Sequence, residues 1–404
     1  MRVLVVGAGI GGLTAALSLH AAGIDVRLVD RADELRPLGV GINLLPHATG
    51  ALAGLGLHEH LAAQAVATSE LVHFDRFGNE IWREPRGLAA GHDWPQYSVH
   101  RGRLQALLLA AVRDRLGAGA VRTGHRFVTA VEESGRVRAV IQDRRDETTT
   151  EWDTDVLVGA DGLHSAVRSY LYPKEGAPRW NGIRMWRGTA AAPPFLTGSS
   201  MLMAGSNHTA KMVAYPLATA ADDGTVPVNW VAEVQTPHSA QGAADWTRTG
   251  RLADIAPHYR DWHIAGLDIG ALLAATETVL EYPMVDRDPL PRWSFGRITL
   301  LGDAAHPMYP IGSNGGSQAI LDAIALAAAL RECADPADGL AAYESARRES
   351  ANAVVLANRD MPMDRTLRLV AERAPHGFTR VEDVLSTAEL RAITDGYRRT
   401  SATR

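Results

Sequence analysis

The sequence predicts an α/β fold in which Rossmann-type pieces lie at both ends of the chain and β-rich segments are inserted between them. A strand–loop–helix–strand unit with a Gly-x-Gly-x-x-Gly loop occupies the first thirty residues. From about residue 180 to 282, short strand-like runs are separated by Pro and Gly, and a buried-strand pattern returns near residue 297. With 404 residues, the chain is long enough for two or three packed domains.

The first unit is complete within thirty residues. Val3–Val6 is an unbroken apolar run, which is typical of a strand buried on both faces of a parallel sheet. An apolar helix follows the glycine loop to about Ala22, and Gly23 ends it as a left-handed cap. Ile24–Val29 is a second strand, which Asp30 closes. This is one βαβ unit.

The glycine loop of this unit predicts a dinucleotide site. Gly7 permits a tight turn, Gly9 lets backbone amides approach a pyrophosphate, and Gly12 lets the helix pack close to the strand. The helix N-terminus then faces the phosphate charge. Asp30 is placed to accept hydrogen bonds from an adenosine ribose. The motif does not distinguish FAD from NAD.

The remaining elements follow in order along the chain. A β-hairpin is expected around Gly78-Asn79 and a helix from near Arg103. The other expected strands are Val121–Val128, Arg136–Gln142, Asp155–Val158, Ile183–Arg187, Met212–Tyr215, Val228–Gln235 and Arg297–Leu301. Two further helices are expected over Gln318–Leu330 and about 337–358.

Two later strands each deliver an acid on a glycine turn. One ends in Asp161-Gly162, and the other ends in Gly302-Asp303, nearly three hundred residues after the first glycine loop. Asp161 has an alternative role, because it could simply cap the helix that follows. The glycine-rich stretch 310–316 opens the last apolar helix, whose free amides suit an anionic group. An ordinary loop and cap is the alternative there.

Composition excludes several functions. The formal net charge is −5, so we expect no nucleic-acid partner. The single cysteine, Cys333, excludes an internal disulfide framework. We expect no membrane span, no signal peptide and a cytoplasmic location. No His-x-x-x-His or Cys-x-x-Cys spacing predicts a metal site.

The glycine loop at residues 7–12 and the two acid-bearing turns, Asp161-Gly162 and Gly302-Asp303, are three sequence fingerprints. In this order and spacing they resemble those of the class A flavoprotein monooxygenases of the p-hydroxybenzoate hydroxylase type. The resemblance covers essentially the whole chain to about residue 358. Four stretches are similar to the bacterial phenazine hydroxylases that act on methylated phenazine carboxylate, with salicylate hydroxylase-like enzymes more distant. These stretches begin at Arg36, Gln96, Met185 and Tyr282.

This resemblance implies a discontinuous Rossmann-like (GR2-type) FAD-binding domain over 1–70, 100–175 and 283–335. A β-sheet-rich substrate domain would cover 71–99 and 176–282, and a C-terminal helical segment 336–404. Asp303 would bind the ribityl chain of FAD, and Arg101 its phosphate and ribityl region. The implied cofactor-binding residues are Gly7, Gly9, Ile10, Gly11, Gly12, Asp30, Arg31, Val40, Gly41, Ile42, Arg101, Gln105, Asp161, Gly162, Gly302, Asp303, Pro310, Gly312, Asn314, Gly315 and Gly316.

The implied reaction is hydroxylation of an aromatic or heteroaromatic small molecule, phenazine-like or phenolic and carboxylated, in secondary metabolism. NADH or NADPH binds transiently and reduces the flavin, O2 adds at flavin C4a to give a hydroperoxide, and one oxygen atom passes to the ring. The enzyme would be a monomer or homodimer. A reductase, oxidase or halogenase of the same fold is the alternative, and an NAD-dependent dehydrogenase is a further one.

No catalytic residue follows from the sequence. Tyr215, Tyr309, His208 and His306 have suitable chemistry for a base, although His306 lies in the cofactor fingerprint, where a structural role is expected. Lys211 could meet a substrate carboxylate, although a lysine is ordinarily exposed. The substrate candidates, each with packing as its alternative role, are Trp186, Arg187, Lys211, Tyr215, Trp230 and Tyr309.

Overall fold

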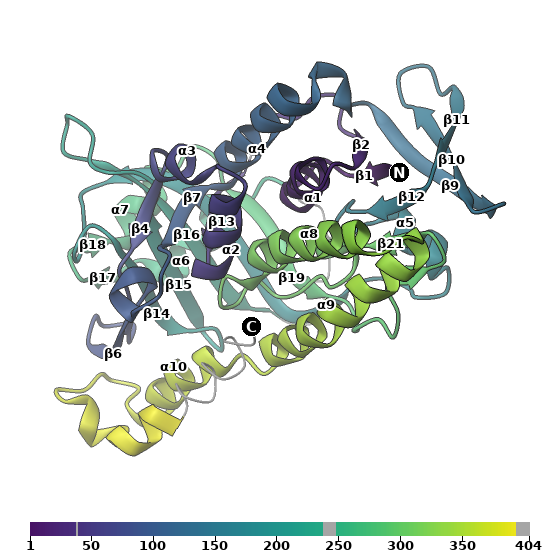
Figure 1. Cartoon of the computed structure of the whole chain (residues 1–404). Coiled ribbons are helices and arrows are strands. Elements are labelled where there is room, and N and C mark those ends of the chain that lie inside the picture. The colour runs from purple at the N-terminus through teal and green to yellow at the C-terminus, as the bar shows by residue number, and fades with distance from the viewer. Residues whose placement is uncertain (38, 237–247, 393–404) are drawn as a thin grey trace.

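A six-stranded sheet organises the first unit of the computed structural model, which describes residues 1–37, 39–236 and 248–392 (Figure 1). The strand order is β20-β21-β12-β1-β2-β8. All neighbouring strands are parallel except β20 and β21. The strands are β1 (Arg2–Val6), β2 (Asp25–Val29), β8 (Val121–Arg122), β12 (Val156–Gly159), β20 (Ser294–Phe295) and β21 (Ile298–Leu300).

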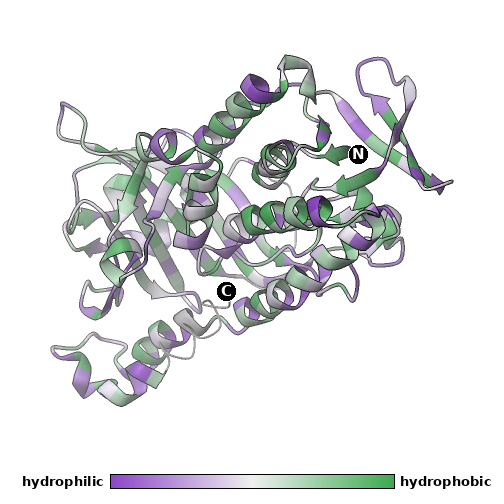
Figure 2. Ribbon diagram, in the orientation of Figure 1, coloured by the Kyte–Doolittle hydropathy of each residue, from purple (hydrophilic) through white to green (hydrophobic). Residues whose placement is uncertain are grey.

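Two apolar helices pack together beside this sheet. α1 (Ile10–Ala21) has nine buried residues, and α8 (Asn314–Glu332) has ten. A helix that is apolar on most sides must be covered on most sides, and the two helices contact each other closely. Figure 2 shows both as largely hydrophobic ribbons. α4 (Arg101–Leu116) and α9 (Pro336–Arg359) pack beside them.

A seven-stranded sheet forms the second unit, in the order β19-β13-β16-β15-β14-β5-β6. The hairpin β5–β6 comes from early in the chain and joins the sheet through a parallel pairing of β5 with β14. The strands are β5 (Glu70–Phe74), β6 (Glu80–Pro85), β13 (Arg179–Ala192), β14 (Ser200–Ser206), β15 (Ala210–Pro216), β16 (Val226–Gln235) and β19 (Leu280–Asp286).

The two faces of this sheet carry separate cores. Side chains alternate between faces along each strand, so Tyr215 and Val213 share one face while Ala214 and Met212 share the other. The inner face packs against Tyr309 and Ile311, which come from the loop that precedes α8. The outer face is covered by α6 (Leu252–Tyr259) and α7 (Ile269–Ala274).

Smaller elements complete the fold. β3 (Gly41–Leu44), β7 (Gln96–His100) and β4 (Ala65–Thr68) form one antiparallel sheet, and β9 (His125–Glu133), β10 (Arg136–Asp143) and β11 (Thr149–Thr154) form another. The short helices are α2 (Pro46–Gly54), α3 (His58–Ala62) and α5 (Ala166–Leu171). A two-stranded ribbon joins β17 (His263–Ile264) to β18 (Leu267–Asp268).

The predicted fold class is confirmed, while several element boundaries differ. The expected strand Val121–Val128 is divided into β8 and β9 around Gly124, whose φ is +71°. The last apolar helix begins at Asn314, so Gly315 and Gly316 lie inside its first turn. The expected helix 337–358 is α9. α10 (Pro362–Arg373) lies in the expected C-terminal helical segment, although no separate helix was predicted there.

The predicted domain limits stay a prediction. Tyr97 and Val99 belong to the core of the first unit, although the expected substrate domain extends to residue 99. β19 continues the seven-stranded sheet to Asp286, past the expected limit at 282. Residues 393–404 of the expected C-terminal segment lie outside the described residues.

Candidate active site

The β1–α1 loop has the geometry that a phosphate-binding turn requires. Gly7 has φ +109° and donates its N–H to the Val29 carbonyl at 2.7 Å. A Cβ on Gly12 would lie 1.9 Å from the Gly7 oxygen, so only glycine fits there. A Cβ on Gly9 would meet no heavy atom within 4 Å. The loop is therefore closed toward the protein and open at Gly9, where α1 begins.

Asp30 and Gln105 meet on Ala8 of this loop. Asp30 Oδ2 accepts the Ala8 N–H at 2.7 Å, and Oδ1 accepts the Ala32 N–H at 2.8 Å. Gln105 Nε2 donates to the Ala8 carbonyl at 2.8 Å. Both predicted residues thus lie at the loop. Arg31 is exposed, and only its backbone oxygen takes part in a described hydrogen bond.

Arg101 begins α4 and is exposed. Its backbone N–H donates to the Val40 carbonyl at 2.9 Å, which joins two predicted cofactor segments. A Cβ on Gly39 would lie 3.9 Å from Arg101 Cβ. The guanidinium therefore projects from the same region as the Val40–Ile42 segment.

Asp161 follows β12 and packs against the glycine loop, because a Cβ on Gly7 would lie 2.8 Å from Asp161 Cα. Its carboxylate accepts hydrogen bonds from the Ala166 N–H at 2.7 Å and from the Ser165 hydroxyl. Burial raises the pKa of Asp161, although these hydrogen bonds oppose that rise. Ser165 is the N-cap residue of α5, and Asp161 accepts the N–H groups of Ala166 and Val167 in its first turn, as its alternative role requires. Gly162, with φ +79°, has open space around its Cα.

Asp303 lies at the other glycine turn and remains exposed. Gly302 has φ +60°, and a Cβ on Gly315 would lie 3.9 Å from Asp303 Oδ1. The structure therefore places the third fingerprint at the start of α8. Pro310 is exposed beside it, and Gly312 has φ +67°.

His306 is buried inside this fingerprint and is held by Asp322. His306 Nε2 lies 2.5 Å from Asp322 Oδ2, and Arg347 Nε donates to Asp322 Oδ1 at 2.9 Å. Burial acts to raise the pKa of Asp322, but His306 and Arg347 outweigh it and the pKa falls below its usual value. His306 therefore has a structural role rather than that of a free base.

The Val40–Ile42 segment joins the two units. Gly41 donates its N–H to Asn229 Oδ1 at 2.6 Å and accepts from Arg187 Nη2 at 2.8 Å. A Cβ on Gly316 would lie 2.8 Å from Ile42 Cδ1. The start of α8, this segment and the inner face of the seven-stranded sheet therefore converge on one place.

Tyr215 lies at this convergence. A Cβ on Gly41 would lie 2.6 Å from Tyr215 Cε2. Burial raises the pKa of Tyr215, while the positive charge of Arg187 and hydrogen bonds from Arg187, Asn229 and Asn43 oppose that rise. Among the substrate candidates, Tyr215 and Arg187 are thus brought directly against the predicted flavin segment.

Other substrate candidates lie elsewhere. Trp186 and Trp230 belong to the outer-face core, and Trp230 Nε1 donates to Thr276 at 2.8 Å. The sheet separates this core from the convergence at Gly41, and their assignment as substrate residues stays a prediction. Tyr309 lies on the inner side, where burial and then Asp286 raise its pKa to about 12. His208 is exposed on the β14–β15 turn.

Lys211 is neither exposed nor free for a substrate. Its Nζ lies 2.6 Å from Asp364 Oδ1 and 2.9 Å from Glu233 Oε2, and all three side chains are buried. Burial works against the charged amine, but the two carboxylates outweigh it and raise the pKa of Lys211. The proposed contact with a substrate carboxylate is therefore corrected to an internal ion-pair triad.

Sequence reasoning missed Asn43 and Asn229. Asn43 lies in the family-like stretch that begins at Arg36, and its Oδ1 accepts from the Ser98 hydroxyl at 2.6 Å. Asn229 lies on the expected strand Val228–Gln235, two residues from the inner-face Val231. A buried polar residue in an apolar strand is an informative signal and could have marked Asn229.

The arrangement suits FAD. The open side of Gly9 lies at the N-terminus of α1, where amides favour a pyrophosphate. Two buried polar atoms near the convergence, Asn314 Oδ1 and Arg187 Nε, find no hydrogen-bond partner among the described residues. Buried polar groups are nearly always paired, so these atoms indicate a bound polar group.

Comparison with known proteins decides the family. The FAD binding domain family matches residues 1–358. This chain belongs to that family. The flavoprotein is 48% identical over 402 residues to the phenazine 1,6-dicarboxylic acid hydroxylase PhzS of Lysobacter antibioticus, covering 98% of this chain and 96% of the relative. It is 31% identical to the 6-hydroxynicotinate 3-monooxygenase of Bordetella bronchiseptica, covering 90% and 92%.

The fold of the flavoprotein matches HpxO of Klebsiella pneumoniae, complexed with FAD and uric acid, with a TM-score of 0.77 and 24% identity over 99% of this chain and 95% of that one. The predictions of an FAD-dependent aromatic monooxygenase, and of NAD(P)H and O2 as its co-substrates, are confirmed by these relatives. Within the described ranges, no helix has the length and apolarity to cross a membrane, and no acidic, His and Cys cluster suits a metal ion.

Asp303→Ala is expected to lower FAD affinity about 10- to 100-fold, because a hydrogen bond to a charged group contributes about 1.5–3 kcal/mol. The exposed carboxylate accepts no hydrogen bond from the described residues, so thermal stability without FAD should be unchanged. Flavin absorbance per protein measures the effect. Asp303→Asn keeps the size of the side chain and one hydrogen-bond acceptor. Its FAD affinity should therefore lie between those of the wild type and Asp303→Ala. Equal flavin content in all three proteins would contradict the assignment.

Proposed function

We propose that the flavoprotein hydroxylates a planar aromatic or heteroaromatic substrate, phenazine-like or phenolic and carboxylated, held between bound FAD and the inner face of the seven-stranded sheet. The cluster of Gly41, Arg187, Tyr215 and Asn229 carries this proposal, because it joins the predicted flavin segment to that face. The similarity to a phenazine dicarboxylic acid hydroxylase supports the substrate class.

Bound FAD supplies the electron transfer and the activation of oxygen, and the chain supplies position and a site shielded from water. The residues proposed for FAD lie in three groups: the β1–α1 loop with Asp30, the Asp303 turn, and the first turn of α8 with Gly41. On the substrate side, the inner-face core offers apolar and thioether walls for a flat ring, including Met185, Val213 and Val231. The cytoplasmic location and a monomeric or dimeric state stay predictions.

The reaction is tested with a panel of aromatic carboxylates, phenols and phenazine carboxylates on FAD-loaded protein. We expect some members to accelerate NADH or NADPH oxidation and to gain one oxygen atom, measured by mass spectrometry with 18O2. Oxidation without any oxygenated product across the panel would favour an oxidase or reductase. A colourless protein that does not bind added FAD would refute the cofactor as well.

Tyr215→Phe is expected to lower, by about tenfold, the fraction of oxidised NAD(P)H that yields hydroxylated product. The substitution removes a hydrogen bond of the Tyr215 hydroxyl, and a loss of about 1.4 kcal/mol corresponds to a tenfold change in rate. Flavin content should not change, because the ring that contacts Gly41 is kept. The matched control is Tyr259→Phe, since Tyr259 is buried on the outer face and donates to the Lys211 carbonyl at 2.8 Å. The assignment fails if both variants couple like the wild type.

A further inference from the structure

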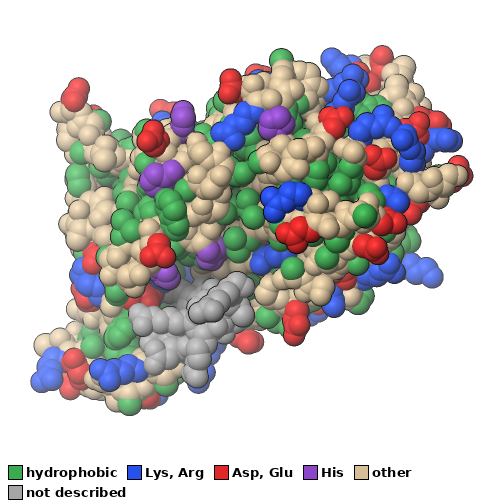
Figure 3. All heavy atoms as spheres, viewed as in Figure 1, with side chains coloured by type: hydrophobic (Ala, Val, Ile, Leu, Met, Phe, Trp, Pro, Cys, Tyr) green, Lys and Arg blue, Asp and Glu red, His purple; other side chains and the backbone are tan. Residues whose placement is uncertain are grey.

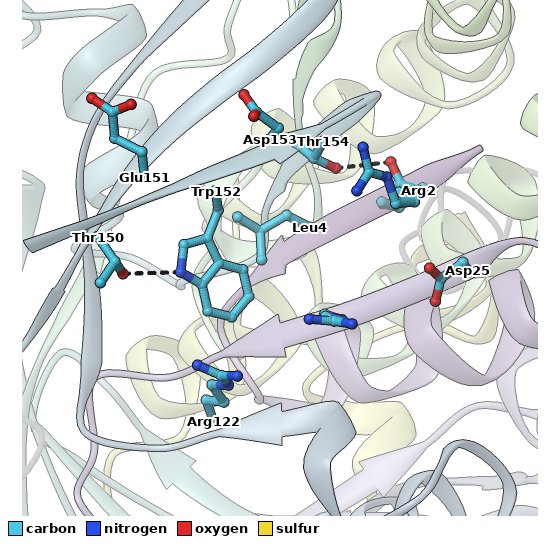
Figure 4. A pocket seen from close by; sticks show the side chains of 11 residues that line it. Arg2, Leu4, Asp25, Arg122, Thr150, Glu151, Trp152, Asp153 and Thr154 are labelled. Carbon is cyan, nitrogen blue, oxygen red and sulfur yellow. Dashed lines mark hydrogen bonds between the residues drawn. The ribbon is translucent and has the colours of Figure 1, made fainter.

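A surface pocket of about 460 Å3 lies between strands β1, β2 and β8 of the six-stranded sheet and the neighbouring strand β11 (Figure 4). Its lining includes Arg2, Leu4, Arg27, Arg122 and Trp152, and none of these residues belongs to the glycine fingerprints. The volume lies within the range of small-molecule sites. No part of the proposed reaction uses it.

The strand register places three guanidinium groups on one face. Arg2 pairs with Asp25 across β1 and β2, and Leu4 pairs with Arg27. Arg122 of β8 pairs with Val29 of β2, two residues beyond Arg27. Neighbours in register point to the same side of a sheet, so Arg2, Arg27 and Arg122 share the face that β11 covers in part.

The opposite wall is aromatic. Trp152 of β11 is half-buried, its Nε1 donates to Thr150 Oγ1 at 3.0 Å, and Arg122 lies 5.0 Å from the centre of its ring. Figure 4 shows the indole directed into the pocket toward Leu4. At one end of the pocket a hydrogen bond joins β11 to β1, because Thr154 Oγ1 donates to the Arg2 carbonyl at 2.8 Å.

The three arginines differ from their neighbours in lacking counter-charges. No carboxylate of the described residues lies within 4.0 Å of the guanidinium of Arg2, Arg27 or Arg122. By contrast, Arg138 on β10 lies 3.6 Å from both Glu151 and Asp153, which alternate to the other face of β11.

Asp25, Glu151 and Asp153 also line the pocket. Glu151 and Asp153 each lie 3.6 Å from Arg138 Nε, so Asp25 is the carboxylate that the register places on the same sheet face as the three arginines. Figure 3 shows charged side chains of both signs crowding the end of the molecule that carries β9–β11. Unneutralised guanidinium groups gathered around an indole favour a planar anion, because arginine pairs with carboxylates in two-point contact and its flat face stacks on rings.

We propose that this pocket binds a small planar aromatic carboxylate, with its ring against Trp152 and its carboxylate on Arg27 and Arg122. The proposal is independent of the hydroxylation site, since the pocket shares no residue with it. Binding is expected to weaken with ionic strength, because the three arginines are exposed to solvent.

The test titrates FAD-loaded protein with naphthalene-2-carboxylate in a calorimeter. The probe can also enter the hydroxylation site, so the number of bound molecules is measured, and two per chain are expected. Arg27→Gln with Arg122→Gln should remove one of the two or weaken it at least tenfold. Arg138→Gln is the matched control, an exposed arginine of the adjoining sheet that does not line the pocket, and should leave both sites intact.

Two further arms fix the class of ligand. Trp152→Leu should weaken naphthalene-2-carboxylate at the same site, and inorganic phosphate, which has no ring, should bind the wild type at least tenfold more weakly. A number and affinity of bound molecules that the double variant leaves unchanged, or equal losses in Arg138→Gln and the double variant, would overturn the site. Phosphate binding as tight as that of naphthalene-2-carboxylate would overturn the aromatic part of the proposal.

Discussion

Gly12→Ala is expected to abolish FAD binding and to destabilise the first unit. The added Cβ would lie 1.9 Å from the Gly7 carbonyl oxygen, a backbone atom that cannot turn aside. Excess volume costs about 1–3 kcal/mol where side chains can move, and here the β1–α1 turn itself must open. Flavin content per protein and the thermal midpoint of the FAD-free protein measure the two effects.

Gly9→Ala is the matched variant. Unlike Gly12→Ala, it should leave the stability of the FAD-free protein unchanged. Gly9 has φ −74°, which any residue adopts, and a Cβ there meets no protein atom within 4 Å. The FAD-free protein should therefore unfold at the wild-type temperature. FAD affinity should still fall, because the methyl group would occupy the space assigned to the pyrophosphate. If Gly9→Ala keeps full flavin content, the phosphate site has been placed wrongly.

Lys211→Met is expected to destabilise the second unit by about 3–5 kcal/mol, the usual result of removing one partner of a buried ion pair. The carboxylates of Glu233 and Asp364 would then remain buried side by side without the cation that pairs with both of them. The midpoint of urea unfolding measures the loss. The chain has only one other lysine, Lys174, which is exposed, so Lys174→Met removes the same charge and should leave the midpoint unchanged.

The pH dependence of this variant gives a second test. Burial raises the pKa of Glu233, and Lys211 opposes that rise in the wild type. Without the lysine, the folded-state pKa of Glu233 rises further above its unfolded value. A carboxyl group with a raised pKa costs stability as pH increases through that value. The deficit of Lys211→Met should therefore shrink from pH 8 to pH 5.5, and a constant deficit would exclude an electrostatic cause.

The first unit could be predicted because its signals are local. An apolar run, a glycine loop and a closing Asp30 lie within thirty residues, and each has a direct backbone cause. For the β-rich unit, the sequence predicted strand-like runs separated by Pro and Gly, but neither the full set of strands nor their order in the sheet. β14 and β19 were missed, because Met and Gly interrupt the first and Pro283 the second, and both strands are fixed by their neighbours in the sheet.

The candidate site divides in the same way. Gly7, Gly12 and Gly302 have conformations or close contacts that the sequence motif already required. Which inner-face residues meet Gly41 depends on strand alternation and register, so Tyr215 could not be separated from Trp230 beforehand. A one-residue change of parity moves a side chain to the other face of the sheet.

The parallel pairing of β5 with β14 also affects how the chain is made. Ser200 donates to Glu70 across 130 residues of sequence, so the β5–β6 hairpin has no partner strand on that edge until β14 has been synthesised. At about 5–20 residues per second, that interval is about 6–26 s on the ribosome. During it, the apolar edge that carries Val72 and Phe74 is open to other chains. Low temperature, which weakens hydrophobic association between chains, and help from chaperones should therefore raise the yield of this enzyme more than substitutions on its surface do.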